Sequence, residues 1–285
     1  MLLTAITSLV YAVQSYAEKK TVSSGISRKD FFFFSCLSLL PFAGLMMLLT
    51  PFYFQPSCWL IPILLVSLLL RYGKMTAIVS TVERLVPYES EAYMCLGVIL
   101  AYAVDCVLGV KAFSVWGAAS IAVTLLGGFL IADVKLQIKK FRVNLIIRIL
   151  CDVGLGYCAR YAMLYCSNAT YIFALNALIV MLFCWKYLFR KGSRSKENRP
   201  NLKLVIIQQF LGFVCLFLAN FVAQESVTLY AFIRPLCLAL CVIIAFFLKK
   251  PPAQSSQFGE PCRPKIKDVL AIALIIAGIC LQVVK

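Results

Sequence analysis

Polar and charged positions divide the 285-residue chain into a series of long apolar runs. Because about 20 apolar residues cross the hydrocarbon layer of a bilayer as a helix, each run predicts one membrane-spanning helix. The sequence therefore predicts an all-α polytopic membrane protein with ten transmembrane helices. The runs lie near residues 2–17, 31–50, 57–72, 76–108, 113–132, 143–162, 169–189, 203–222, 226–248 and 268–284.

The run at 76–108 is too long for one straight span, since it would make about 50 Å of helix. Pro87 marks a break inside it. The charged start of this run is either a cytoplasmic vestibule or a plain loop, and the pattern favours the loop. The residues concerned are Glu83, Arg84, Glu89 and Glu91.

Composition supports the membrane interpretation. Hydrophobic residues make up 62% of the chain and charged residues 14%, whereas about 25% is usual for the charged share of soluble domains. The net charge of +16 would suggest nucleic acid in a soluble protein, but here the basic residues lie in the gaps between apolar runs, so we expect the lipid bilayer and no nucleic acid as a partner. Histidine is absent, and the 13 cysteines contain no CxxC pair, so we predict no metal site and no cofactor.

The basic residues are distributed unevenly between the gaps. Twenty-three of the 28 Lys and Arg residues follow odd-numbered runs, and only Lys111 and Lys285 lie on the other side. The positive-inside rule then places the odd-numbered gaps in the cytoplasm and both termini outside. In 1–141 the basic gaps follow the first and third runs, whereas in 142–285 they follow the second and fourth runs of that half, as in an inverted repeat. Any ten-span chain alternates in this way, so the prediction of two five-helix repeats, 1–141 and 142–285, also depends on a resemblance between the halves.

The fifth and tenth runs resemble each other. Both 113–131 and 266–281 start after a basic residue, carry small residues at one-turn spacing and contain a late glycine, Gly127 or Gly278. Small residues let membrane helices approach closely. These two runs either pack against each other or each pack within their own half.

Three segments resemble the drug/metabolite transporter superfamily, in particular its EamA-like branch. Residues 226–235, with their proline, are similar to the ninth helix of that family, and 269–284 are similar to its closing glycine-bearing helix. Residues 72–87 resemble its passage from the third to the fourth helix. The resemblance implies two five-helix repeats and transport of a small solute. The sequence departs from the family at 109–111, where Gly-Val-Lys replaces an acidic residue.

Charged residues inside apolar runs are the first candidates for substrate binding, because each costs about 2.5–3.5 kcal/mol at the bilayer centre. Arg148 and Asp152 stand four residues apart and predict an ion pair, either structural or opened by substrate. Arg234 precedes Pro235, and its partner is a substrate anion, a backbone carbonyl freed by Pro235, or Asp152 across the interface. We expect Arg234, Arg148 and Asp152 to border a polar cavity between the halves.

Uncharged polar residues complete the predicted site. Asn176 stands inside an apolar run and either lines the pathway or bonds another helix. Tyr157 and Tyr230 belong either to the pathway or to an interfacial aromatic belt. Asp105 either exchanges a proton, as transport carboxylates do, or lies at the outer interface near Lys111, and the pattern favours the interface.

The function that this pattern favours is secondary-active transport of a small polar or anionic metabolite by alternating access between the two repeats. No P-loop motif occurs in the sequence. The alternatives are a membrane-embedded lipid-modifying enzyme and a non-transporting scaffold. We expect a small-molecule substrate as partner and leave a homodimer open. The expected location is the cell membrane, inner or plasma, with the Golgi or endoplasmic reticulum membrane as the alternative.

Overall fold

The computed structural model describes residues 2–24, 28–131, 139–184, 202–247 and 266–283. In these ranges the chain is 87% helical and forms no strand, which confirms the predicted all-α class for the described residues. One isolated β-bridge pairs Phe54 with Cys166. The helices are α1 Leu2–Ser23, α2 Arg28–Leu49, α3 Leu60–Val82, α4 Pro87–Met94, α5 Gly97–Val107, α6 Val115–Ile131, α7 Lys139–Ala162, α8 Asn168–Ile179, the π-helix η1 Val180–Cys184, α10 Leu202–Glu225, α11 Val227–Phe247 and α12 Ile266–Val283.

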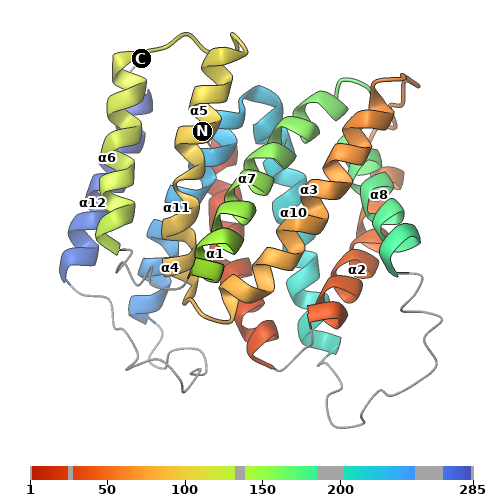
Figure 1. Cartoon of the computed structure of the whole chain (residues 1–285), viewed down its shortest axis with the longest axis horizontal. Coiled ribbons are helices and arrows are strands. Elements are labelled where there is room, and N and C mark those ends of the chain that lie inside the picture. Colours follow the sequence, from red (N-terminus) through yellow and green to blue (C-terminus); the bar gives the residue numbers. More distant parts are fainter. Residues whose placement is uncertain (1, 25–27, 132–138, 185–201, 248–265, 284–285) are drawn as a thin grey trace.

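The helices stand side by side and run alternately up and down (Figure 1). A helix occupies each predicted run, with α4 and α5 sharing one run and α8 and η1 another. By length and hydropathy, five segments of the described chain are able to cross a membrane; the number of actual spans stays a prediction. The five are Phe31–Leu49, Leu60–Val82, Pro87–Val107, Lys203–Glu225 and Val227–Phe247.

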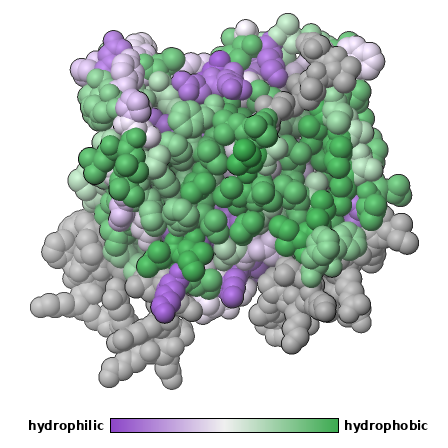
Figure 2. Space-filling model, turned by 180° about the vertical axis from the view of Figure 1, so that it is seen from behind, coloured by the Kyte–Doolittle hydropathy of each residue, from purple (hydrophilic) through white to green (hydrophobic). Residues whose placement is uncertain are grey.

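The outer surface supports embedding in lipid. Figure 2 shows a broad hydrophobic band across the middle of one face of the molecule, with hydrophilic residues at its upper and lower edges. Large apolar side chains are exposed along the helices, for example Leu69 on α3 and Leu270 on α12. A continuous apolar surface of this extent is rare on soluble monomers, whereas it matches the hydrocarbon layer of a bilayer.

The third and fourth runs are divided differently from the prediction. Helix α3 continues to Val82, so it contains Lys74, which lies in the gap between the predicted runs 57–72 and 76–108. Pro87 begins α4, where its missing N–H costs no helical hydrogen bond. A second break at 95–96 separates α4 from α5. The long run is therefore interrupted, and its charged start is divided between the turn at 83–86 and the buried helix α4.

The fifth and tenth runs form the helices α6 and α12, which pack against each other more extensively than any other pair of described helices. A Cβ atom on Gly127 would lie 2.6 Å from the carbonyl oxygen of Ala271. The Ser120 hydroxyl donates to the carbonyl oxygen of Gly278 at 2.6 Å. Of the two arrangements that the sequence left open, the structure has the direct pairing.

The main contacts elsewhere also join early helices to late ones. Helix α3 packs on α7, α1 packs on α10 and α11, α2 packs on α8, and α11 packs on α4 and α5. Each pair brings a helix from before residue 132 against one from after residue 138. The described parts of the two halves thus share one interior rather than forming separate cores.

Candidate functional site

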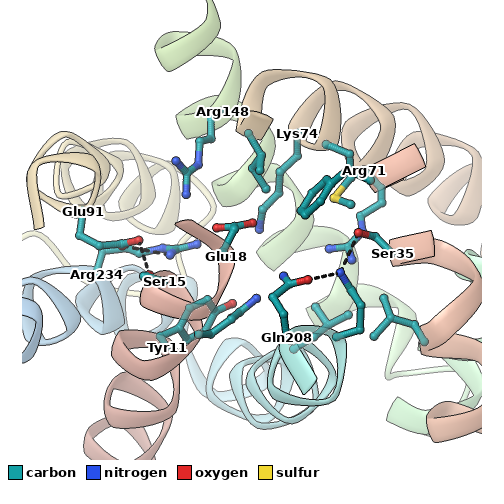
Figure 3. Close-up of a pocket in the computed structure, with 18 residues that line it drawn as sticks. Tyr11, Ser15, Glu18, Ser35, Arg71, Lys74, Glu91, Arg148, Gln208 and Arg234 are labelled. Atoms are coloured by element: carbon teal, nitrogen blue, oxygen red, sulfur yellow. Dashed lines mark hydrogen bonds and ion pairs between the residues drawn. The ribbon is translucent and has the colours of Figure 1, made fainter. Parts of the chain in front are cut away.

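A polar cavity lies inside this packing and is lined by residues of α1, α2, α3, α4, α7, α10 and α11 (Figure 3). Ionisable groups within apolar membrane helices are expensive, and they mark candidate functional sites. The charged side chains on the cavity wall are Glu18, Arg71, Lys74, Glu91, Arg148 and Arg234.

An ion-pair network around Arg234 joins four helices. The Arg234 guanidinium donates to Asp152 Oδ2 from Nε at 3.0 Å and from Nη2 at 2.8 Å. Its Nη1 atom lies 3.1 Å from Glu91 Oε2. Lys74 pairs with the other oxygen of Asp152, and the Tyr11 ring lies 4.6 Å below the Arg234 guanidinium. The network therefore neutralises two buried acids with two cations and adds a cation–π contact.

The structure identifies the partner of Arg234 that the sequence left open. Asp152, across the interface between the halves, is one partner, and Glu91 is a second that the sequence analysis assigned to a loop. Glu91 is only 1% exposed, and its other oxygen accepts a hydrogen bond from Ser15 at 3.1 Å. The assignment of Glu91 to a loop is wrong because α4 turns its side chain into the bundle.

The predicted Arg148–Asp152 ion pair is also wrong. Arg148 donates from Nη1 to Thr81 Oγ1 at 3.1 Å and to Ser90 Oγ at 2.7 Å. Asp152 is instead held by cations on α3 and α11. The physical reason is that Lys74 and Arg234 reach Asp152 from neighbouring helices, while Arg148, one turn earlier on α7, bonds hydroxyl groups of α3 and α4.

The remaining predicted site residues separate into two groups. The Tyr230 hydroxyl donates to Asp152 Oδ1 at 3.3 Å and so belongs to the network. Neither Asp152, which was expected to border the cavity, nor Tyr230 is part of its wall, and Tyr157 and Asn176 also lie outside it. The Tyr157 hydroxyl donates to Asp105 Oδ1 at 2.9 Å, and the Asn176 amide donates to the carbonyl oxygen of Ile172 at 2.8 Å within α8.

Asp105 lies near Lys111, as expected, because the Lys111 backbone N–H donates to the Asp105 carbonyl oxygen at 3.2 Å, but its side chain packs inside the bundle. It is fully buried and accepts hydrogen bonds from Tyr157, from Ser226 Oγ at 3.0 Å, and from both the backbone N–H (2.9 Å) and the hydroxyl (2.6 Å) of Thr228. Thr228 is in the first turn of α11. Asp105 on α5 therefore caps the helix that carries Arg234, as an acid at a helix N-terminus does favourably.

Sequence reasoning missed several cavity residues because they stand near predicted gaps. Glu18 was left outside the first run, but α1 continues to Ser23. A signal was present: Tyr11, Gln14, Ser15 and Glu18 recur at helical spacing and form one polar face. All four line the cavity.

Some polar groups of the cavity have no partner in the described part of the chain. Buried atoms without a hydrogen bond include Gln14 Oε1, Arg71 Nε and Arg148 Nε, and these three residues line the cavity. Buried polar atoms are normally bonded, so each exception calls for an explanation. A polar ligand with acceptor oxygens would satisfy both guanidinium groups. The described residues contain no group of three His, Cys, Asp or Glu side chains suited to a metal ion.

Comparison with known proteins identifies a fold but no family. No protein-family model and no curated protein matches the chain. Twenty-six chains of solved structures are similar to it. One of them, the crystal structure of a protein that is 14% identical in sequence, has a TM-score of 0.65 over 99% of this chain and 96% of the other. The likeness shows that the helical arrangement of this chain occurs in a solved protein along nearly its whole length.

Proposed function

We propose that the chain is a secondary transporter that carries a small polar or anionic solute across a membrane through the cavity. The observation that carries this proposal is a charge-lined cavity enclosed by helices of both halves. The molecule around it exposes large apolar side chains along its helices and carries a broad apolar band on the face drawn in Figure 2. Buried charges are costly in such surroundings. Binding of a polar solute explains why those charges are present, whereas a scaffold that only contacts lipid needs no charged cavity.

We further propose that ten spans form two inverted repeats, 1–141 and 142–285. The contact pattern supports this when α4 with α5, and α8 with η1, each count as one span. The third span then packs on the sixth (α3 on α7) and the eighth on the first (α10 on α1), and a shift of five spans exchanges these pairs. The same shift maps α2 on α8 and α6 on α12 onto themselves. A substrate site between such repeats is typical of secondary transporters.

The resemblance of 72–87, 226–235 and 269–284 to the EamA-like branch of the drug/metabolite transporters agrees with this proposal. We accordingly assign the chain to that branch, with its solute and the lipid bilayer as partners and no enzymatic activity. The proposed location is the plasma or inner membrane, and a Golgi or endoplasmic reticulum membrane is the alternative.

Solute flux into liposomes tests the proposal. The purified protein is reconstituted, and small carboxylates, phosphates and neutral polar metabolites are screened for saturable uptake above protein-free liposomes. Arg71→Gln should abolish the uptake without unfolding the protein, because the Arg71 guanidinium lines the cavity and makes no hydrogen bond to the described residues. Arg160→Gln, which alters an exposed contact with the Glu225 carbonyl oxygen, is the matched control. Folded protein that transports none of these solutes would contradict the proposal.

A further inference from the structure

Glu18 differs from Asp152 and from Glu91, the other acid of the cavity wall, because it has no partner among the described residues. Asp152 and Glu91 are each bonded to cations. Glu18 is only 7% exposed and lines the cavity, yet its carboxylate accepts no hydrogen bond and forms no ion pair within the described part of the chain. A buried carboxylate without a partner is costly in its ionised form. Its presence at this depth therefore requires an explanation.

The charged groups around Glu18 come from every neighbouring helix of the cavity. Arg148 of α7, Glu91 of α4, Lys74 of α3 and Arg234 of α11 act on it electrostatically, and Asp152 lies behind Lys74 and Arg234. Arg71 lies one turn before Lys74 on α3. On α1 itself, Ser15 donates to Glu91, and Lys19 donates to the carbonyl oxygens of Val82 and Glu83 at the end of α3. Lys74 and Arg234 are paired with acids, whereas Arg148 is bonded only to the hydroxyl groups of Thr81 and Ser90.

Arg148 is a cationic group on the cavity wall that faces Glu18. It is 3% exposed, and its Nε atom is buried without a partner. In Figure 3 the Arg148 guanidinium points toward the cavity in which the Glu18 carboxylate lies. One unpaired acid and one incompletely bonded guanidinium thus face the same cavity from α1 and α7.

We propose that Glu18 and Arg148 form a combined site in which an oxyanion and a proton bind together. The oxyanion is a carboxylate or phosphate group of the solute and binds at Arg148, while Glu18 takes one proton from water and becomes a neutral carboxylic acid. The reason is electrostatic, since two anions side by side in a poorly solvated cavity repel each other strongly. The site rests on the proposed transport function and adds to it that the solute moves with a proton.

Oxyanion binding at several pH values tests the site. The probes are sodium sulfate and sodium methanesulfonate, whose charges stay constant between pH 5.5 and 8. Their apparent affinities are measured from the rise in melting temperature of the detergent-purified protein, against sodium chloride at equal ionic strength. A stronger response to methanesulfonate indicates a carboxylate-like ligand, and a stronger response to sulfate indicates a phosphate-like one.

The proposal expects the affinity of the parent protein to fall about tenfold per pH unit where Glu18 is ionised. Glu18→Gln should bind the probe equally well at every pH, and Glu225→Gln, at the exposed end of α10, should behave like the parent. An affinity that does not depend on pH, an unchanged pH dependence in Glu18→Gln, or no binding at any pH would overturn the proposal. Proton-linked binding in the absence of solute flux into liposomes would support this site but refute the transport function.

Discussion

Arg234 joins two acids from other helices, Asp152 of α7 and Glu91 of α4, at distances of 2.8–3.1 Å. Arg234→Gln leaves both acids in the interior with one cation fewer. Removing one partner of a buried ion pair typically costs about 3–5 kcal/mol of unfolding free energy. We expect a loss of that order in denaturant unfolding of the detergent-purified protein.

Arg234→Lys should recover part of this loss, because an ammonium keeps the charge but not the two-pronged contact with Asp152. Arg160→Gln, near the end of α7, controls for the loss of an arginine elsewhere. If Arg234→Gln were as stable as the parent but failed to transport, the structural role would be wrong and Arg234 would be a substrate-binding residue.

At this scale the sequence identified part of the site for a physical reason. Arg148, Asp152 and Arg234 stand in the middle of apolar runs, where a charge has no other explanation than an interior partner. Glu18 and Lys74 could not be assigned in the same way, because a charge near a predicted gap looks solvated when the helix end is unknown. The pairing itself depends on distances between helices, which no single run contains.

The pairing of α6 and α12 depends on glycine at the contact. Gly127→Ala would put a Cβ atom 2.6 Å from the Ala271 carbonyl oxygen and 2.7 Å from Ile275 Cγ1, so the helices must separate. Overpacking of this kind typically costs about 1–3 kcal/mol. Gly128→Ala is the matched control, because its Cβ would meet Cys95 at 3.6 Å, an ordinary contact. Thermal unfolding of the two variants should differ by several degrees, and equal stabilities would contradict the close packing.

The start of α11 depends on Asp105. Asp105→Asn keeps the shape but replaces an acceptor oxygen with an amide donor that faces other donors. Disrupting this buried hydrogen-bonded group should cost about 1–3 kcal/mol. Thermal unfolding measures the loss, with Glu225→Gln as a control at the neighbouring end of α10. Because α11 carries Arg234, we also expect slower transport in Asp105→Asn. A variant with the stability and transport of the parent would show that the cap does not position α11.

The helices themselves followed from hydropathy better than their ends did. The runs at 113–132 and 226–248 match α6 and α11 within a few residues. The run at 57–72 ended too early because Lys74 was taken as part of a gap, although α3 buries the Lys74 side chain against α7. Hydropathy records the average surroundings of a segment, so a polar stripe that faces a cavity looks like the end of a helix.

For the whole molecule, the positive-inside pattern predicts opposite sidedness for the loop around Lys196 and the loop before α6. Lys196 lies outside the described residues. Phe113 is exposed in the described loop between α5 and α6. In a Cys58→Ser background, Lys196→Cys should react with an impermeant thiol reagent from the cytoplasmic side and Phe113→Cys from the outer side. Reaction of both from the same side would contradict the topology.

Transport by alternating access requires the cavity to open to each side of the membrane in turn. Ser35 lines the cavity from α2 and accepts a hydrogen bond from Gln209 at 2.7 Å, but it takes no part in the ion-pair network. The most direct measurement is the labelling of Ser35→Cys, in the Cys58→Ser background, by an impermeant thiol reagent applied to either side of oriented vesicles. Alternating access predicts reaction from both sides, each above the background of the parent lacking the introduced cysteine. Reaction from one side only, as in an enzyme or scaffold with a single opening, would contradict the account.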